Sequence, residues 1–260
     1  MKSAPMPSDV DLDGLLKRLH LANTRRVWKD VVLRAEQEQW KYRDFLALIM
    51  AEEVAQRHQT RLQRVRKKAG FPFLKTVEDF DFTLQSTLRV KMLGTYLSPE
   101  LVTEGRNLIL FGRSGRGKTH LAVAIAYKAI QNGFDALFTT AAELIDDLSK
   151  ASTDGRLRKE KAKYLQPDVL VVDEVGYLSY GSDAANVLFH VVNDRHLKRK
   201  PMLFTTNKRP KAWGTVLHDA DLAEAIIDRI LERGQILSLD GPSSRTSHID
   251  PEILGGGPAE

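Results

Sequence analysis

The spacing of apolar residues changes along the chain and separates a helical N-terminal part from an alternating α/β part. Over roughly the first 80 residues, the apolar positions follow a helical period. They predict three helices, near residues 8–19, 24–40 and 42–68. Gly70 and Pro72 follow the third helix and are typical of the end of one.

Between about residues 83 and 240, short apolar runs of strand length alternate with helical segments. This alternation favours a parallel sheet covered by helices on both faces. A late amphipathic helix over Asp221–Arg233 ends in a cation followed by a glycine, as helix C-termini often do. Five strands are predicted, at Leu108–Phe111, Ala136–Thr139, Val169–Asp173, Met202–Thr206 and Ile236–Leu239.

These patterns predict a helical domain over residues 1–80, an α/β domain over 81–240 and a partly disordered tail over 241–260. The chain has no cysteine, which excludes disulfides and thiolate metal sites and fits a reducing bacterial cytoplasm. Its apolar stretches are only strand-sized, so we expect no membrane span and no membrane partner. The net charge of +5 is modestly basic and does not by itself identify a polyanionic partner.

The run Gly112–Thr119 fits the phosphate-loop pattern G-x-x-x-x-G-K-[ST] at every fixed position. A strand-like segment precedes it and a helix-like segment follows it, which favours nucleotide binding over a chance glycine-rich turn. Lys118 would neutralise the β and γ phosphates, and the Thr119 hydroxyl would hold Mg²⁺. We therefore predict an ATP site contacted by Gly112, Arg113, Ser114, Gly115, Arg116, Gly117, Lys118, Thr119 and His120.

Two further strands end in polar residues that suit phosphate chemistry. Asp173 and Glu174 close an apolar strand, and such strand ends face the crevice where the phosphates lie. Asp173 would join Thr119 at Mg²⁺, and Glu174 would orient or deprotonate the attacking water. Asn207 ends the next strand and could hold that water or detect the γ-phosphate, although an Asn there is often only a turn residue.

Phosphoryl transfer also needs a cation at the departing phosphate, which an arginine finger from a neighbouring subunit commonly supplies. Arg229 and Arg233 lie one turn apart on the late helix, and either could reach a neighbour's nucleotide. The alternative is a surface salt bridge with one of the nearby acids Glu224, Asp228 and Glu232. We favour Arg229 as the finger.

The third helix carries six basic residues and no acid between residues 54 and 68. Four of them fall within roughly 60° on one face of the helix, where like charges repel one another unless an anion neutralises them. A phosphate backbone would do so, and few aromatic residues interleave for single-strand stacking. We predict duplex DNA binding with little sequence preference, although a solvated or protein-docking face is the alternative. The four residues are Arg57, Arg61, Arg64 and Lys68.

Four runs of residues resemble those of a known protein family. They are Gly112–Thr119 with the following His120-Leu121-Ala122, Asp173-Glu174-Val175-Gly176-Tyr177-Leu178, Thr205-Thr206-Asn207, and Leu222-Ala223-Glu224-Ala225-Ile226-Ile227-Asp228-Arg229. Over most of residues 10–247 the chain resembles the IstB-type ATP-binding proteins, AAA+ helpers encoded beside an IstA-type transposase in bacterial insertion sequences. These are relatives of the DnaC/DnaI helicase loaders. The second and fourth runs are more particular to the family than the first.

The resemblance implies an AAA+ P-loop NTPase domain with a non-sequential strand order and a helical insertion between its second and third strands. Residues 144–165 fit that insertion, and its Arg156, Arg158 and Lys159 are available to contact DNA. Too few residues follow the sheet for a C-terminal lid domain. By motif match Arg229 takes the finger role, and Arg245 is a second arginine at the nucleotide.

The family's activity is likewise carried over as an expectation. The resemblance implies ATP-dependent homo-oligomers on duplex DNA that deform the DNA and recruit or activate a cognate transposase. Many relatives read Arg-Tyr-Glu where this chain has Arg195-His196-Leu197, so Arg195 is given no role.

Three other functions compete with this one. A replicative helicase loader would share the fold but favour single strands, and the basic helix face speaks against it. A P-loop kinase would need neither Glu174 nor a finger from another subunit. A DNA-binding module with a vestigial ATP site would not need Lys118, Thr119, Asp173 and Glu174 together.

Overall fold

A computed structural model of the chain describes residues 10–85, 87–177, 180–181 and 183–243. Contacts within the chain divide it into two compact units, residues 1–64 and 65–260. The division falls inside helix α3 (Tyr42–Ala69), before the domain end expected at residue 80. The segment 76–82 therefore belongs to the second unit, where its Phe80 is buried.

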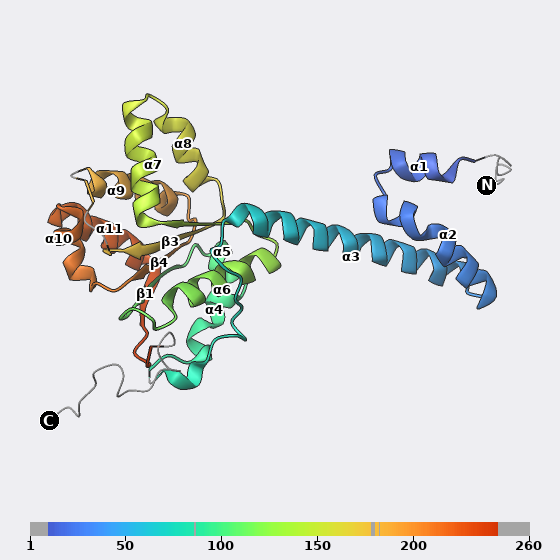
Figure 1. The fold of residues 1–260 in the computed structure, drawn as a ribbon, viewed down its shortest axis with the longest axis horizontal. Helices are drawn as coiled ribbons and strands as arrows, with labels where there is room; N and C mark the ends of the chain where they lie inside the picture. Colours follow the sequence, from blue (N-terminus) through green and yellow to red (C-terminus); the bar gives the residue numbers. More distant parts are fainter. Residues whose placement is uncertain (1–9, 86, 178–179, 182, 244–260) are drawn as a thin grey trace, which may run out of the picture. The chain divides into compact units, whose positions relative to one another are not determined.

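The first unit consists of α1 (Leu12–Arg18), α2 (Ala22–Gln37) and most of α3 (Figure 1). The carboxylate of Asp11 caps α1 by accepting a hydrogen bond from the Gly14 amide at 2.9 Å. This cap explains why the helix begins at Leu12 rather than near residue 8, which lies outside the described residues. Glu53, which is 4% exposed, joins α3 to the start of α2 by accepting from the amide of Thr24 at 2.8 Å.

The second unit is built on a five-stranded parallel sheet whose spatial order is β2-β3-β4-β1-β5. This order is non-sequential, as the family resemblance implies, and all five strands form within two residues of the predicted bounds. The apolar side chains of β3 and β4, in the middle of the sheet, are buried on both faces, as expected of a parallel sheet, whereas Ile236 on the edge strand β5 is exposed. The strands are β1 (Asn107–Phe111), β2 (Ala136–Thr140), β3 (Val169–Val175), β4 (Met202–Thr206) and β5 (Gly234–Ser238).

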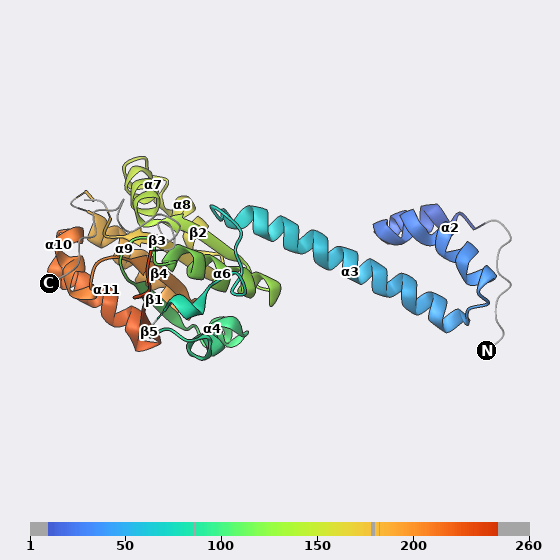
Figure 2. The same ribbon diagram turned by 60° about the horizontal axis from the view of Figure 1, so that its bottom comes forward.

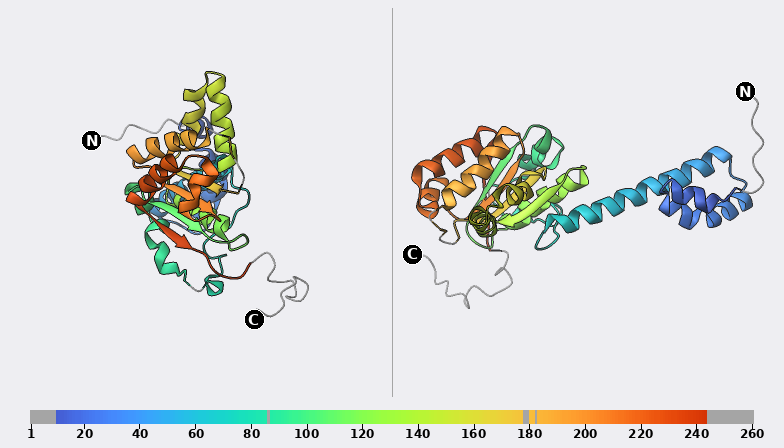
Figure 3. Two further views of the ribbon diagram at one scale, coloured as in Figure 1. Left: turned by 90° about the vertical axis from the view of Figure 1, so that its left-hand side faces the viewer. Right: turned by 90° about the horizontal axis from the view of Figure 1, so that it is seen from above.

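Helices cover both faces of this sheet (Figures 2 and 3). The helix α6 (Lys118–Gln131) packs on one face, while α7, α9, α10 and α11 share a buried apolar cluster on the other. That second layer comprises α7 (Ala141–Thr153), α8 (Leu157–Leu165), α9 (Ala184–Leu197), α10 (Trp213–Leu217) and α11 (Ala220–Glu232). The pair α7 and α8 lies between β2 and β3 in the chain, where the insertion was expected.

Short helical turns lead from the first unit into the sheet and from β4 to α10. They are η1 (Phe82–Leu84), η2 (Val90–Leu93), α4 (Gly94–Leu97), α5 (Glu100–Thr103) and η3 (Pro210–Ala212). Strand β5 is the last element within the described ranges. Of the helices that the structure describes, none has both the length and the apolar character needed to cross a bilayer.

Arg195, to which the sequence gives no role, is buried and connects several segments of this fold by hydrogen bonds. Its side chain is fully buried and donates to the backbone carbonyl oxygens of four residues, at distances between 2.7 and 3.0 Å. The acceptors precede β3 and β4, so Arg195 ties α9 to the amino ends of two central strands. These acceptors belong to Tyr164, Pro167, Asp168 and Pro201.

Candidate nucleotide-binding site

A cleft of about 630 Å³ lies at the carboxyl ends of β1 and β3. It brings together residues that the sequence predicts for the ATP site, from the phosphate loop and from the end of β3. The segment that precedes the sheet also lines it, with Pro72, Phe73 and Lys75, none of which is predicted from the sequence. The predicted members of the lining are Ser114, Gly115, Gly117, Lys118, Thr119, His120, Asp173 and Glu174.

The phosphate loop connects β1 to α6. Two of its glycines are required both by their backbone conformation and by close packing. Gly115 and Gly117 have φ angles of +78° and +84°, in the left-handed region that favours glycine. A β-carbon on Gly117 would lie 2.6 Å from the ring of Phe80, and one on Gly115 would overlap the side chain of Ser243. The loop is thus packed between the segment that precedes the sheet and the one that follows β5.

Lys118 and Thr119 occupy the positions expected of phosphate and metal ligands. The Lys118 side chain is buried, and its Nζ donates to the carbonyl oxygen of Arg113 at 2.9 Å and to the hydroxyl of Tyr177 at 3.2 Å. The Thr119 hydroxyl donates to the two carboxylate oxygens of Asp173 at 3.0 and 3.1 Å. A hydroxyl beside a carboxylate is an all-oxygen donor set of the kind that Mg²⁺ prefers, so these two residues fit the predicted metal role.

The end of β3 is held in an irregular conformation that separates the roles of its two carboxylates. The pairing of β3 with β4 shifts register between Val172 and Val175. Asp173 stays buried, whereas Glu174 is exposed in the cleft with a φ of +61°. Asp173 thus faces Thr119, while Glu174 is free to meet a water in the cleft, which supports its predicted part in water activation.

Thr205 on β4 links these two residues and was not assigned a role from the sequence. Its hydroxyl donates to a carboxylate oxygen of Asp173 and accepts from the Glu174 amide at 3.0 Å. Tyr180 fixes the following turn, because its hydroxyl donates to the carbonyl of Glu174 at 3.2 Å and accepts from the Gly176 amide at 3.1 Å. In the sequence, Thr205 could be recognised only as a polar residue near the end of a buried strand.

Asn207 follows β4, as predicted, but it is not part of the cleft lining. Within the described residues its buried Oδ1 has no hydrogen-bond partner. A buried amide oxygen without a donor is costly, and a water molecule would satisfy it. Its role in holding the attacking water therefore stays a prediction.

Other residues of the predicted ATP site hold neighbouring segments in place. The His120 ring lies with Nε2 2.9 Å from the carbonyl oxygen of Thr76 and packs edge-on against Phe80, and burial lowers its pKa. Arg116 donates to the carbonyl of Asp240 at 3.3 Å. Arg245 lies outside the described residues, so its predicted contact with the nucleotide stays a prediction.

The two finger candidates differ in what they contact on their own chain. Arg233 donates to the carbonyl of His196 at 2.8 Å, so it serves the end of α9. Arg229 is half-exposed on α11, donates to Asn193 at 3.0 Å and lies over the ring of Phe189. Neither arginine lines the phosphate cleft, and among the described residues no salt bridge of Arg229 is found.

The residues predicted to bind DNA fall into two groups by their contacts. Arg57 pairs with the buried Glu53 at 2.9 Å and donates to the carbonyl of His20, so it stabilises the helical unit. Arg156 pairs with Asp154 at the turn between α7 and α8. Of the other predicted residues, Arg61 is half-exposed. The remaining four side chains are exposed, namely Arg64, Lys68, Arg158 and Lys159.

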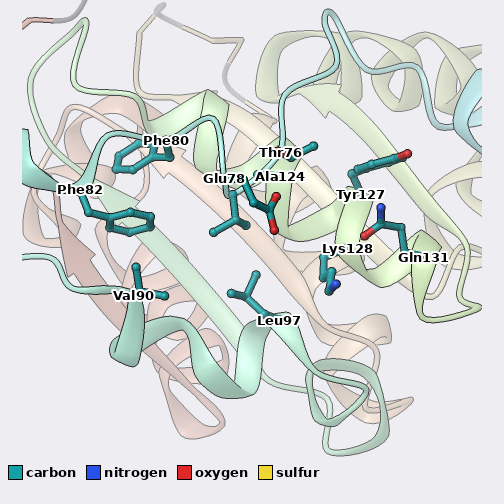
Figure 4. A pocket seen from close by; sticks show the side chains of 11 residues that line it. Thr76, Glu78, Phe80, Phe82, Val90, Leu97, Ala124, Tyr127, Lys128 and Gln131 are labelled. Carbon is teal, nitrogen blue, oxygen red and sulfur yellow. The ribbon is translucent and has the colours of Figure 1, made fainter.

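A second cavity, of about 340 Å³, lies between α6 and the segment 76–82 (Figure 4). Its walls are largely apolar, and Glu78 and Lys128 bring opposite charges to them. Phe80 lines this cavity and also meets Gly117, so the segment 76–82 has the phosphate loop on one side and the cavity on the other.

Comparison with known proteins agrees with this geometry. The family model described as IstB-like ATP-binding protein matches residues 14–250. The chain is 34% identical over 235 residues to the ATP-binding protein of insertion sequence IS21 from Pseudomonas aeruginosa, covering 90% of this chain and 88% of the relative. It is 32% identical over 228 residues to that of IS5376 from Geobacillus stearothermophilus, covering 88% of this chain and 90% of the relative.

Solved structures share the fold at lower identity. AMPPCP-bound DnaA from Aquifex aeolicus matches with a TM-score of 0.56 and 19% identity, covering 73% of this chain and 57% of the other. DnaI matches with a TM-score of 0.55 and 21% identity, covering 67% of this chain and 93% of the other. At such identities the likeness concerns the fold alone, which is that of AAA+ P-loop proteins.

Proposed function

The chain belongs to the IstB-like ATP-binding protein family, and from this premise we propose that it is an AAA+ ATPase that assembles on duplex DNA. In the proposal, ATP lies between neighbouring copies, and the assembly remodels target DNA and recruits or activates the transposase of its insertion sequence. Mg²⁺ bound by Thr119 and Asp173 would offset the charge of the phosphates.

The position of Arg229 is the observation that carries the assembly part of this proposal. The cleft contains the phosphate loop and both carboxylates of β3, yet Arg229 lies outside its lining. The described lining supplies Lys75 and Lys118 but no arginine, so an arginine finger would come from elsewhere, and a half-exposed arginine on another copy would supply it. The contacts of Arg229 with Asn193 and Phe189 orient its side chain, which supports Arg229 over Arg233.

The basic face of α3 supports the DNA part. The residues Arg61, Arg64 and Lys68 share this face, next to the strip where Val65 and Ala69 are buried. Like charges on one stripe repel one another, and phosphates relieve that repulsion while releasing counterions. Arg57 is better assigned to the fold, since its partner Glu53 is buried.

A charge-reversal pair on one helix tests duplex binding. The double variant Arg61→Glu/Arg64→Glu changes the basic face, whereas Arg66→Glu/Lys67→Glu makes the same change in charge on another side of α3. We expect the first to weaken duplex binding strongly and to reduce the slope of log K against log salt by about 2, close to 0.9 for each lost phosphate contact. Equal losses in the two variants would contradict a specific face.

Assembly is tested by sedimentation of the protein with Mg²⁺, a non-hydrolysable ATP analogue and a duplex. The proposal expects large complexes only when nucleotide and duplex are both present. A protein that stays monomeric under these conditions yet hydrolyses ATP would refute it. Assembly on single strands in preference to duplexes would instead favour a helicase loader, as the structural neighbour DnaC is.

A further inference from the structure

Tyr177 places a phenol beside the lysine of the phosphate loop. Its hydroxyl lies 3.2 Å from Lys118 Nζ, and the centre of its ring lies 5.8 Å from the same atom. Tyr177 also lines the cleft together with Glu174. Because Lys118 is only 5% exposed, its ammonium group depends on acceptors such as this hydroxyl more than on bulk water.

The turn that carries Tyr177 has a defined shape. Glu174 and Gly176 have φ angles of +61° and +89°, and the amide of Tyr177 donates to the Glu174 carbonyl at 3.3 Å. The Tyr180 hydroxyl bridges the same carbonyl and the Gly176 amide. A left-handed conformation at a non-glycine residue is costly unless its surroundings hold it, and here these hydrogen bonds do so. The backbone that carries the phenol of Tyr177 and the carboxylate of Glu174 is therefore held in one hydrogen-bonded turn.

We propose that Tyr177 recognises the γ-phosphate, so that the site distinguishes ATP from ADP through its hydroxyl. A phenol that accepts a hydrogen bond from Lys118 can also donate its own proton to an anionic oxygen. Lys118 of a phosphate loop meets the β and γ phosphates. Since its Nζ and the Tyr177 oxygen are 3.2 Å apart, an oxygen bound by the lysine on that side is within reach of the phenol.

The same turn gives this contact a consequence for catalysis. Glu174 and Tyr177 are joined by a backbone hydrogen bond, so a terminal phosphate held by Tyr177 also fixes the position of Glu174. A simpler role is that the ring only shields the lysine from water. In that case the aromatic ring would suffice and the hydroxyl would contribute nothing to nucleotide preference.

The inference rests on the ATP site of the proposed function. Equilibrium binding of two nucleotides distinguishes recognition by the hydroxyl from shielding by the ring. The Kd values of a non-hydrolysable ATP analogue and of ADP, both with Mg²⁺, are measured for the unchanged protein and for Tyr177→Phe. The matched control is Tyr127→Phe, the same chemical change on α6, where the side chain lines the second cavity instead of the phosphate cleft.

We expect Tyr177→Phe to raise the Kd of the ATP analogue about tenfold, as for loss of one hydrogen bond to a charged group, and that of ADP less than about twofold. Tyr127→Phe should change neither. Equal weakening of both nucleotides by Tyr177→Phe, or no weakening of either, would overturn the inference alone. If the unchanged protein bound neither nucleotide, the inference and the proposed ATP-dependent function would both fail.

Discussion

Replacing Thr205 by valine should weaken both the fold and the catalytic site, because one buried hydroxyl serves both carboxylate residues of β3. Thr205 is 1% exposed, and valine has nearly its shape, so the change removes the hydrogen bonds with little change in packing. The Glu174 amide loses its acceptor, and Asp173 loses one donor but keeps Thr119. A buried group left unsatisfied costs about 1–3 kcal/mol, so we expect a loss of about 1–3 kcal/mol in the free energy of unfolding.

Urea unfolding of the unchanged protein, Thr205→Val and Thr205→Ser measures this loss. The serine variant keeps the hydroxyl and should retain most of the stability and of the ATP hydrolysis rate. In the valine variant, the hydrolysis rate should fall more than the affinity for ATP, because Glu174 is displaced while Lys118 is not. A valine variant within about 0.5 kcal/mol of the unchanged protein, with normal hydrolysis, would refute the bridging role.

Three further predictions concern single side chains. Glu174→Gln should keep ATP binding but slow hydrolysis about a hundredfold or more, which single-turnover assays would detect, and should trap the assembled state. Arg229→Ala should abolish hydrolysis. Activity should return in mixed oligomers with Lys118→Ala subunits, which still carry Arg229. If it does not return, Arg233 is the arginine finger instead. Burial lowers the pKa of His120 below its usual 6.5, so the unfolded chain binds the proton first as the pH falls. The free energy of unfolding should therefore decrease as the pH is lowered from about 7 to about 5, and His120→Gln should make this decrease smaller.

The sheet and the position of the carboxylates at the end of β3 could be predicted because their signals are local. A buried parallel strand is a continuous apolar run, and the residue that ends it stands at the edge where the phosphates bind. Asp173 and Thr119 are far apart in the chain, yet the strand–loop–helix pattern places both at this edge. Their hydrogen bonds at 3.0 and 3.1 Å confirm that the two side chains meet.

The remaining contacts depend on how distant segments pack, which no local pattern contains. Arg57 looked like one of four equal members of a basic stripe, because the acid that pairs with it, Glu53, lies just before the acid-free stretch. The burial of that acid depends on its contact with Thr24 in another helix. Likewise, Thr205 could be identified as a bridge only once the register shift between β3 and β4 was known.

The phosphate loop also contacts the segment that precedes the sheet and the segment that follows β5. Phe80 meets the loop at Gly117 and Ser243 meets it at Gly115, while His120 and Arg116 add hydrogen bonds to the same two segments. Glycine at these positions is therefore required by the packing of protein segments as well as by the approach of phosphates. Any change in the loop on nucleotide binding must be accommodated by both segments, and the first of them leads directly from α3, the helix with the basic face.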